Sequence, residues 1–115
     1  MNSTDIYRIE AGDFPLLLGS STHKPEFIYA RGTLPPPTSP ESDASKTPVG
    51  IAMVGTRRAS TYGMQIAEKL GSQIAACGGL VTSGGAAGID TQALKGALRA
   101  GKKVVAVLGF GAAVV

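Results

Sequence analysis

The chain has no tryptophan and a single cysteine, Cys77, among its 115 residues. One cysteine excludes an internal disulfide and any metal site built from several cysteines. Aromatic residues make up only 5% of the chain, so the core must be built from Val, Leu, Ile and Ala. We interpret Cys77 as a small apolar residue buried on a helix, the common role of a free cysteine.

Long apolar runs are also missing. No stretch approaches the roughly 20 apolar residues that span a bilayer, and the first residues lack the basic and apolar regions of a signal peptide. We therefore expect no membrane partner and a cytoplasmic location. The lone histidine, His23, lies in a polar stretch beside Lys24 and Pro25 and is interpreted as a surface loop residue. We expect no metal and no cofactor.

Proline is concentrated in one place. Residues 34–48, LPPPTSPESDASKTP, hold five of the seven prolines, with Ser, Thr and Asp between them. That composition cannot bury apolar surface and indicates an exposed linker with polyproline character. The linker separates an N-terminal segment, residues 1–33, from a main domain, residues 49–115. The segment is too short for a core of its own, and we expect it to dock on the main domain.

Charge divides the chain in the same way. Residues 1–48 carry four basic and six acidic side chains, a net of −2, and residues 49–115 carry seven basic and two acidic, a net of +5; together they give +3. The basic part also holds most of the glycine-rich loops, which favours an anionic partner.

From residue 49 onward, short apolar runs alternate with helical patterns. The first run, VGIAMV, is typical of a strand covered on both faces. The helical stripe of Ile66, Leu70 and Ile74 recurs every four residues, and Ser60 or Thr61 can cap its start. Strands are predicted near 50–54, 80–83 and 103–108, and helices near 61–77 and 89–100.

The order β-α-β-α-β predicts an α/β fold. Crossover helices of this length make the strands parallel, and right-handed crossovers build one half of a Rossmann-like, doubly wound sheet. The carboxyl ends of the strands then share one edge, where open α/β sheets bind ligands. Three loops should converge at that edge: Gly55–Ala59, Gly84–Gly88 and Gly109–Gly111.

Two of these loops suit an anion. Helix N-termini carry unpaired N–H groups, arginine forks onto phosphate oxygens, and glycine lets a phosphate backbone approach closely. The same residues also fit the alternative of tight turns with a solvated basic pair. The candidate binding residues are Gly55, Thr56, Arg57, Arg58, Ser83, Gly84, Gly85 and Gly88.

Catalytic residues are not apparent. Asp90 is the only acid near the second loop, where a helix first turn favours a carboxylate whatever its role. No paired carboxylates and no base beside a nucleophile occur, so we expect no enzymatic activity. Lys102 and Lys103 fall at the opposite edge of the predicted sheet and are poor site candidates.

The sequence blocks "IAMVGTRRASTYG", "LVTSGGAAGIDTQAL" and "VVAVLGFG" resemble the DNA-processing protein A family, also called Smf. The resemblance covers nearly the whole chain except the linker. It implies protection of incoming single-stranded DNA and loading of a RecA-type recombinase during natural transformation and DNA recombination. It also implies that Arg57 contacts phosphate and that Ser83–Asp90 lines the same pocket.

Two departures from the family pattern stand out. Leu94 occupies the place where the family usually has a histidine, and the chain ends before the family's further strands, basic contacts and dimer surface. The exposed sheet edges predict self-association, with a homodimer as one form. Two alternatives stay open: a nucleotide-processing hydrolase of the same superfamily, whose P-G-G-x-G-T block is absent here, and a non-functional fragment.

Overall fold

The computed structural model describes residues 5–37 and 49–109. The chain divides between Thr47 and Pro48 into two compact units. The second unit, Pro48–Gly109, carries the candidate binding loops. The sequence analysis also predicted a boundary after residue 33, between the N-terminal segment and the linker, and that boundary stays a prediction.

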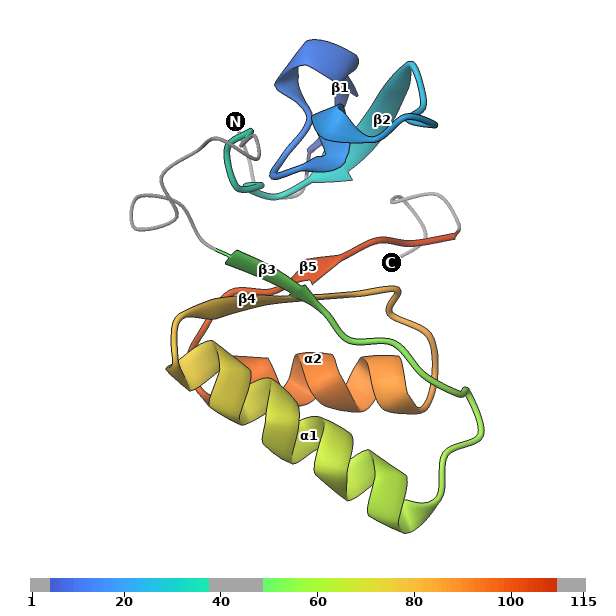
Figure 1. The fold of residues 1–115 in the computed structure, drawn as a ribbon, viewed down its shortest axis with the longest axis vertical. Coiled ribbons are helices and arrows are strands. Elements are labelled where there is room, and N and C mark those ends of the chain that lie inside the picture. The colour runs from blue at the N-terminus through green and yellow to red at the C-terminus, as the bar shows by residue number, and fades with distance from the viewer. Residues whose placement is uncertain (1–4, 38–48, 110–115) are drawn as a thin grey trace. The chain divides into compact units, whose positions relative to one another are not determined.

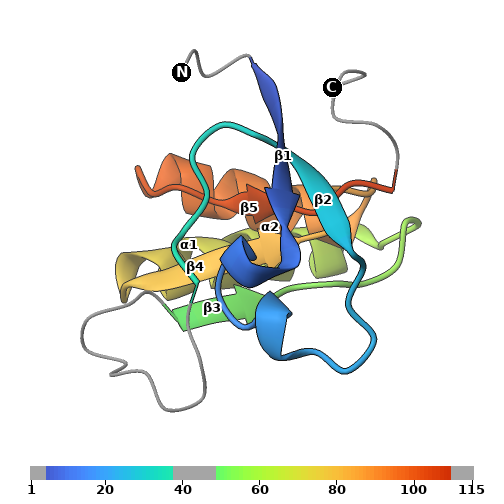
Figure 2. The same ribbon diagram turned by 90° about the horizontal axis from the view of Figure 1, so that it is seen from above.

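The first unit contains an antiparallel pair of strands that the sequence analysis did not predict. Strand β1, Ile6–Glu10, pairs along its length with β2, Phe27–Arg31 (Figures 1 and 2). Two short 3-10 helices, Ala11–Asp13 and Leu18–Ser20, lie between the strands. The docking of this segment on the main domain stays a prediction.

The second unit is built on a three-stranded parallel sheet, which confirms the predicted fold class. Strands β3 (Val49–Ala52), β4 (Gly79–Ser83) and β5 (Val105–Ala106) lie in the order β3-β4-β5 (Figure 2). The third strand is shorter than the predicted 103–108, because only the last two residues of β4 pair with it.

Two helices connect the strands and cover one face of the sheet (Figure 1). Helix α1, Thr61–Ala76, links β3 to β4, and helix α2, Ile89–Arg99, links β4 to β5. Right-handed crossovers in the same direction place both helices on the same side. Ser60 caps α1, and its side-chain oxygen accepts a hydrogen bond from the Gly63 amide at 3.0 Å.

The two helices pack on small side chains. A Cβ atom added to Gly71 would overlap the backbone carbonyl of Ala93, and one added to Gly96 would overlap that of Glu68. Glycine at these places lets the helix backbones touch. The buried cluster beneath them is formed by Ala75, Val81, Ala93 and Ala97.

Helix α1 turns its small residues toward α2, so Ile66 and Leu70 stay partly exposed. Two burial predictions are wrong. Strand β3 is not covered on both faces, because both helices lie on one face and only Ile51 of its four residues is partly buried. Cys77 is exposed, because it lies at the C-terminal end of α1, where the chain turns away from the helix.

Within residues 5–37 and 49–109, no helix is both long and apolar enough to cross a membrane.

Candidate nucleic-acid interface

The two predicted loops meet at the carboxyl ends of β3 and β4, and Asp90 joins them. One carboxylate oxygen of Asp90 accepts a hydrogen bond from the Gly55 amide at 3.1 Å, and the other accepts one from the Gly84 amide, also at 3.1 Å. The side chain belongs to the first turn of α2 and is 5% exposed. A single buried carboxylate thus fixes the spacing between the loops.

Gly88 makes a second contact between the loops. Its φ of +85° lies in the region that favours glycine, and a Cβ there would overlap the backbone carbonyl oxygen of Thr56. The next residue, Ile89, donates its amide to that same carbonyl at 3.2 Å. The chain therefore needs glycine at residue 88 to bring the start of α2 against the first loop.

Ser83 is buried within the sheet and does not face the solvent. Its hydroxyl donates a hydrogen bond to the Met53 carbonyl at 2.7 Å, and its own carbonyl accepts one from the Val107 amide at 2.8 Å. The residue ties the segments after β3 and β5 to the end of β4. Its position favours a supporting role for the hydroxyl over a direct contact with a ligand.

Arg57 and Arg58 lie exposed on the first loop, as a binding role requires. Neither forms an ion pair with an acidic side chain in the part of the chain that the structure describes. The Arg58 amide donates a hydrogen bond to the Thr56 hydroxyl at 3.2 Å, which holds the turn. Both guanidinium groups are therefore available to an anion.

The second loop presents backbone amides. Among the described residues, the amides of Gly85, Ala86 and Ala87 donate no hydrogen bond. Gly85 has a φ of +70°, and the side chain of Leu108 lies 3.1 Å from where its Cβ would be. The segment after β5 therefore borders this loop. Phe110 and Gly111, the rest of the predicted third loop, lie outside the described residues.

Asp90 is the one acidic side chain of the second unit that lies at this edge, and it offsets part of the charge of the two arginines. The two acids in residues 49–115 are Glu68 and Asp90. Asp90 is buried and bonded to amides, while Glu68 pairs with Arg99 on the helix surface. An approaching anion would meet two arginines and open amides there.

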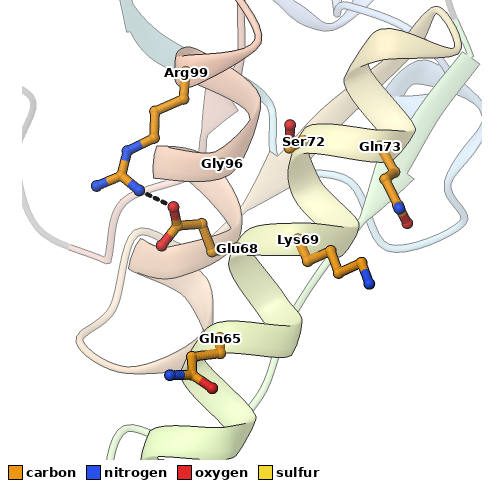
Figure 3. A pocket seen from close by; sticks show the side chains of 7 residues that line it. All are labelled: Gln65, Glu68, Lys69, Ser72, Gln73, Gly96 and Arg99. Atoms are coloured by element: carbon orange, nitrogen blue, oxygen red, sulfur yellow. Dashed lines mark hydrogen bonds and ion pairs between the residues drawn. The ribbon is translucent and has the colours of Figure 1, made fainter.

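A separate hollow of about 490 Å³ lies on the outer face of the helix pair (Figure 3). The Glu68–Arg99 ion pair borders it, and Lys69 extends from the neighbouring turn of α1. It contains none of the predicted site residues, and its mixed charge suits an anion less well than the strand-end loops. Its lining residues are Gln65, Glu68, Lys69, Ser72, Gln73, Gly96 and Arg99.

Sequence reasoning placed Asp90 beside the second loop but missed its two hydrogen bonds, one to an amide of each loop. A usable signal was its position two residues after Gly88, at the start of a helix that follows a glycine loop. In such a turn a carboxylate reaches backbone amides readily. Across the described residues, no group of three or more His, Cys, Asp or Glu side chains could hold a metal ion.

The fold and the strand-end loops define the class: a Rossmann-like α/β domain with a glycine-rich, arginine-bearing edge. Residues 5–115 match the family model described as DNA recombination-mediator protein A. The chain therefore belongs to the DNA recombination-mediator protein A family. It is also 32% identical over 99 residues to Protein Smf of Synechocystis sp., a match that covers 86% of this chain and 24% of that protein.

Two solved structures share the fold. DNA processing protein A from Streptococcus pneumoniae matches with a TM-score of 0.73 and 30% identity, over 95% of this chain and 36% of that one. The protein of the same name from Helicobacter pylori, known for a unique single-stranded DNA binding mode, matches with a TM-score of 0.63 and 28% identity. That match covers 85% of this chain and 41% of the other. This chain thus spans less than half the length of each of these relatives.

Proposed function

We propose that this chain binds single-stranded DNA through its phosphates at the strand-end loops, Gly55–Arg58 and Ser83–Gly88. The observation that carries the proposal is the pair of exposed, unpaired arginines, Arg57 and Arg58, beside loops joined by Asp90. Family membership and the DNA-binding relative from Helicobacter pylori support it. The binding serves DNA processing and involves no chemical change in the DNA.

Each part of the site has a role in this proposal. Arg57 and Arg58 contact phosphate oxygens from one side, and the amides of Gly85 and Ala86 contact them from the other. Gly55, Gly84 and Gly88 keep the two loops close, and Thr56 and Ser83 hold the loop ends in place. Binding is weak and indifferent to base sequence, because few rings are available to stack on bases.

The partner that would receive the DNA is a RecA-type recombinase, acting in the cytoplasm during natural transformation. This finer part of the proposal is supported by family membership alone. It is tested by asking whether the chain speeds the formation of recombinase filaments on single-stranded DNA. No acceleration, with DNA binding intact, would limit the chain to binding.

The test of DNA binding is a titration of isotope-labelled protein with a short unlabelled oligonucleotide, followed by amide NMR signals. Signals from Gly85, Gly88 and Arg57 should shift progressively, while those of Ser72 and Arg99, at the hollow on the helix pair, should stay in place. Shifts confined to the helix face would overturn the placement. No shift at any oligonucleotide concentration would overturn DNA binding itself.

A simple assay distinguishes the hydrolase alternative from the proposed DNA binding. The same protein is incubated with each nucleoside monophosphate, and the products are resolved by chromatography. Under the proposal no base or phosphate is released. Release that is lost in Asp90→Asn or Arg57→Ala protein would assign an enzymatic role to the same edge.

A further inference from the structure

Tyr62 is the one aromatic residue among residues 49–109, the part of the second unit that carries the candidate loops. The buried cluster of this unit is aliphatic and does not include it. Its side chain is 72% exposed and belongs to the first turn of α1. A single exposed ring is common on protein surfaces, so its meaning depends on what surrounds it.

The exposure of Tyr62 follows from its place on the outer face of α1. Five residues at about 100° each put it roughly 140° around the helix from the buried Ala67. Gln65 and Lys69 follow Tyr62 on the same side of the helix. Both are exposed and line the hollow on the outer face of the helix pair (Figure 3). The ring is therefore turned to solvent by the helix itself and not by an open edge of the sheet.

The first turn of α1 lies beside the strand-end loops. It begins shortly after the first loop, and Tyr62 follows Arg58 by four residues. A Cβ atom added to Gly63 would lie 3.6 Å from Cδ1 of Ile89, and one added to Gly55 would lie 2.7 Å from Cβ of the same residue. Ile89 opens α2 directly after the second loop. The first turns of the two helices thus meet at the edge that carries the arginines.

Ser60 fixes the backbone of this turn. Its hydroxyl accepts a hydrogen bond from the Gly63 amide at 3.0 Å, and its carbonyl accepts one from the Met64 amide at 3.0 Å. The Cα–Cβ bonds of a helix tilt toward its N-terminus, so the Tyr62 side chain leaves α1 toward the strand-end loops. Tyrosine has only two side-chain torsions, and little freedom is lost when a flat group stacks on its ring.

We propose that Tyr62 stacks on a base of the single-stranded DNA whose phosphates bind at the strand-end loops, an inference that rests on the proposed function. Every base has a π-face, so one ring accepts any base and adds affinity without sequence preference. In a duplex the bases are already paired and stacked, and exposing one face costs energy. Tyr62 therefore gives the site a preference for single strands that phosphate contacts alone do not supply.

The test compares two labelled oligonucleotides of equal length and charge, one with bases and one abasic, by fluorescence anisotropy. The wild type should bind the strand with bases about 5- to 150-fold more tightly, the range for stacking of one base on a ring. Tyr62→Phe keeps the ring and should keep this ratio, whereas Tyr62→Leu should bring it close to one. All three proteins should bind the abasic strand equally, because the phosphate contacts are unchanged.

Tyr29→Leu is the matched control, since Tyr29 is 62% exposed but lies on β2 of the first unit. It should keep the wild-type ratio, and circular dichroism checks that every variant is folded. Equal affinity of the wild type for both strands would overturn the proposal and leave the phosphate site standing. An unchanged ratio in Tyr62→Leu, even with a loss on both strands, would also overturn it. Failure to bind either strand would overturn the proposed function and this inference together.

Discussion

The carboxylate of Asp90 accepts a hydrogen bond from the amide of Gly55, which lies 35 residues earlier in the chain, at 3.1 Å. The other oxygen of the same carboxylate holds the Gly84 amide. One side chain therefore joins the end of β3 to the end of β4. The stability of the unit and the shape of its candidate binding edge both depend on this residue.

Replacing Asp90 with asparagine should destabilise the protein. The amide side chain keeps one acceptor and turns its NH₂ group toward the other backbone N–H, leaving a buried donor without a partner. That costs about 1–3 kcal/mol of the free energy of unfolding. Glu68→Gln, which breaks an ion pair on the surface, is the control and should cost about 0–1 kcal/mol. Urea denaturation measures both, and equal losses would contradict the special role of Asp90.

Replacing Arg57 with alanine should weaken binding to single-stranded DNA. Removing one phosphate contact makes the plot of log affinity against log salt shallower by about 0.7. The double variant Lys102→Ala/Lys103→Ala is the control, because these residues precede β5 at the opposite edge of the sheet. Fluorescence anisotropy with a labelled oligonucleotide at two salt concentrations measures the slope. Binding lost in the lysine variant and kept in Arg57→Ala would place the site elsewhere.

Replacing Gly88 with alanine should destabilise the unit more than the same change at Gly101. Both glycines have positive φ, +85° and +77°, so each substitution costs about 1–2 kcal/mol in backbone strain. A Cβ at Gly101 meets no atom within 4 Å, whereas one at Gly88 collides with the Thr56 carbonyl. The difference in unfolding free energy measures the contact between the loops. Equal losses would show that the loops separate freely.

Replacing Gly96 with alanine should force the two helices apart. The added Cβ would collide with the Glu68 carbonyl and lie 3.0 Å from the Ser72 amide nitrogen. Overpacking of this kind costs about 1–3 kcal/mol. Gly63→Ala is the matched control within a helix, since its nearest atom is the Ser60 hydroxyl oxygen at 3.3 Å. Thermal unfolding distinguishes them, and a Gly96→Ala protein as stable as the wild type would refute tight backbone contact.

Local patterns predicted the second unit well. The apolar runs and the Ser60 cap placed both helices within a residue of their observed ends, because those signals depend on neighbours in sequence. The face of α1 that packs against α2 was not predicted, for a physical reason. Large residues such as Leu70 suggest a core face, but contact between helix backbones requires the small residues on another face.

The features that sequence reasoning missed involve residues far apart in the chain. The bonds from Asp90 to Gly55 and Gly84, and the one from Ser83 to the Met53 carbonyl, form only after the strands have paired. Their residue types alone do not reveal the partners. The antiparallel pairing of β1 and β2 was missed because it joins residues far apart in the chain, from Ile6 with Arg31 to Glu10 with Phe27.

The central position of β4 bears on how the second unit folds. Each strand pairs with the next one in the chain, Val49 with Gly79 and Thr82 with Val105. Assembly can therefore proceed from the N-terminal side, with β3, α1 and β4 closing first and α2 and β5 adding afterward. Contacts between consecutive elements keep loop closure short, which favours fast folding for a parallel sheet.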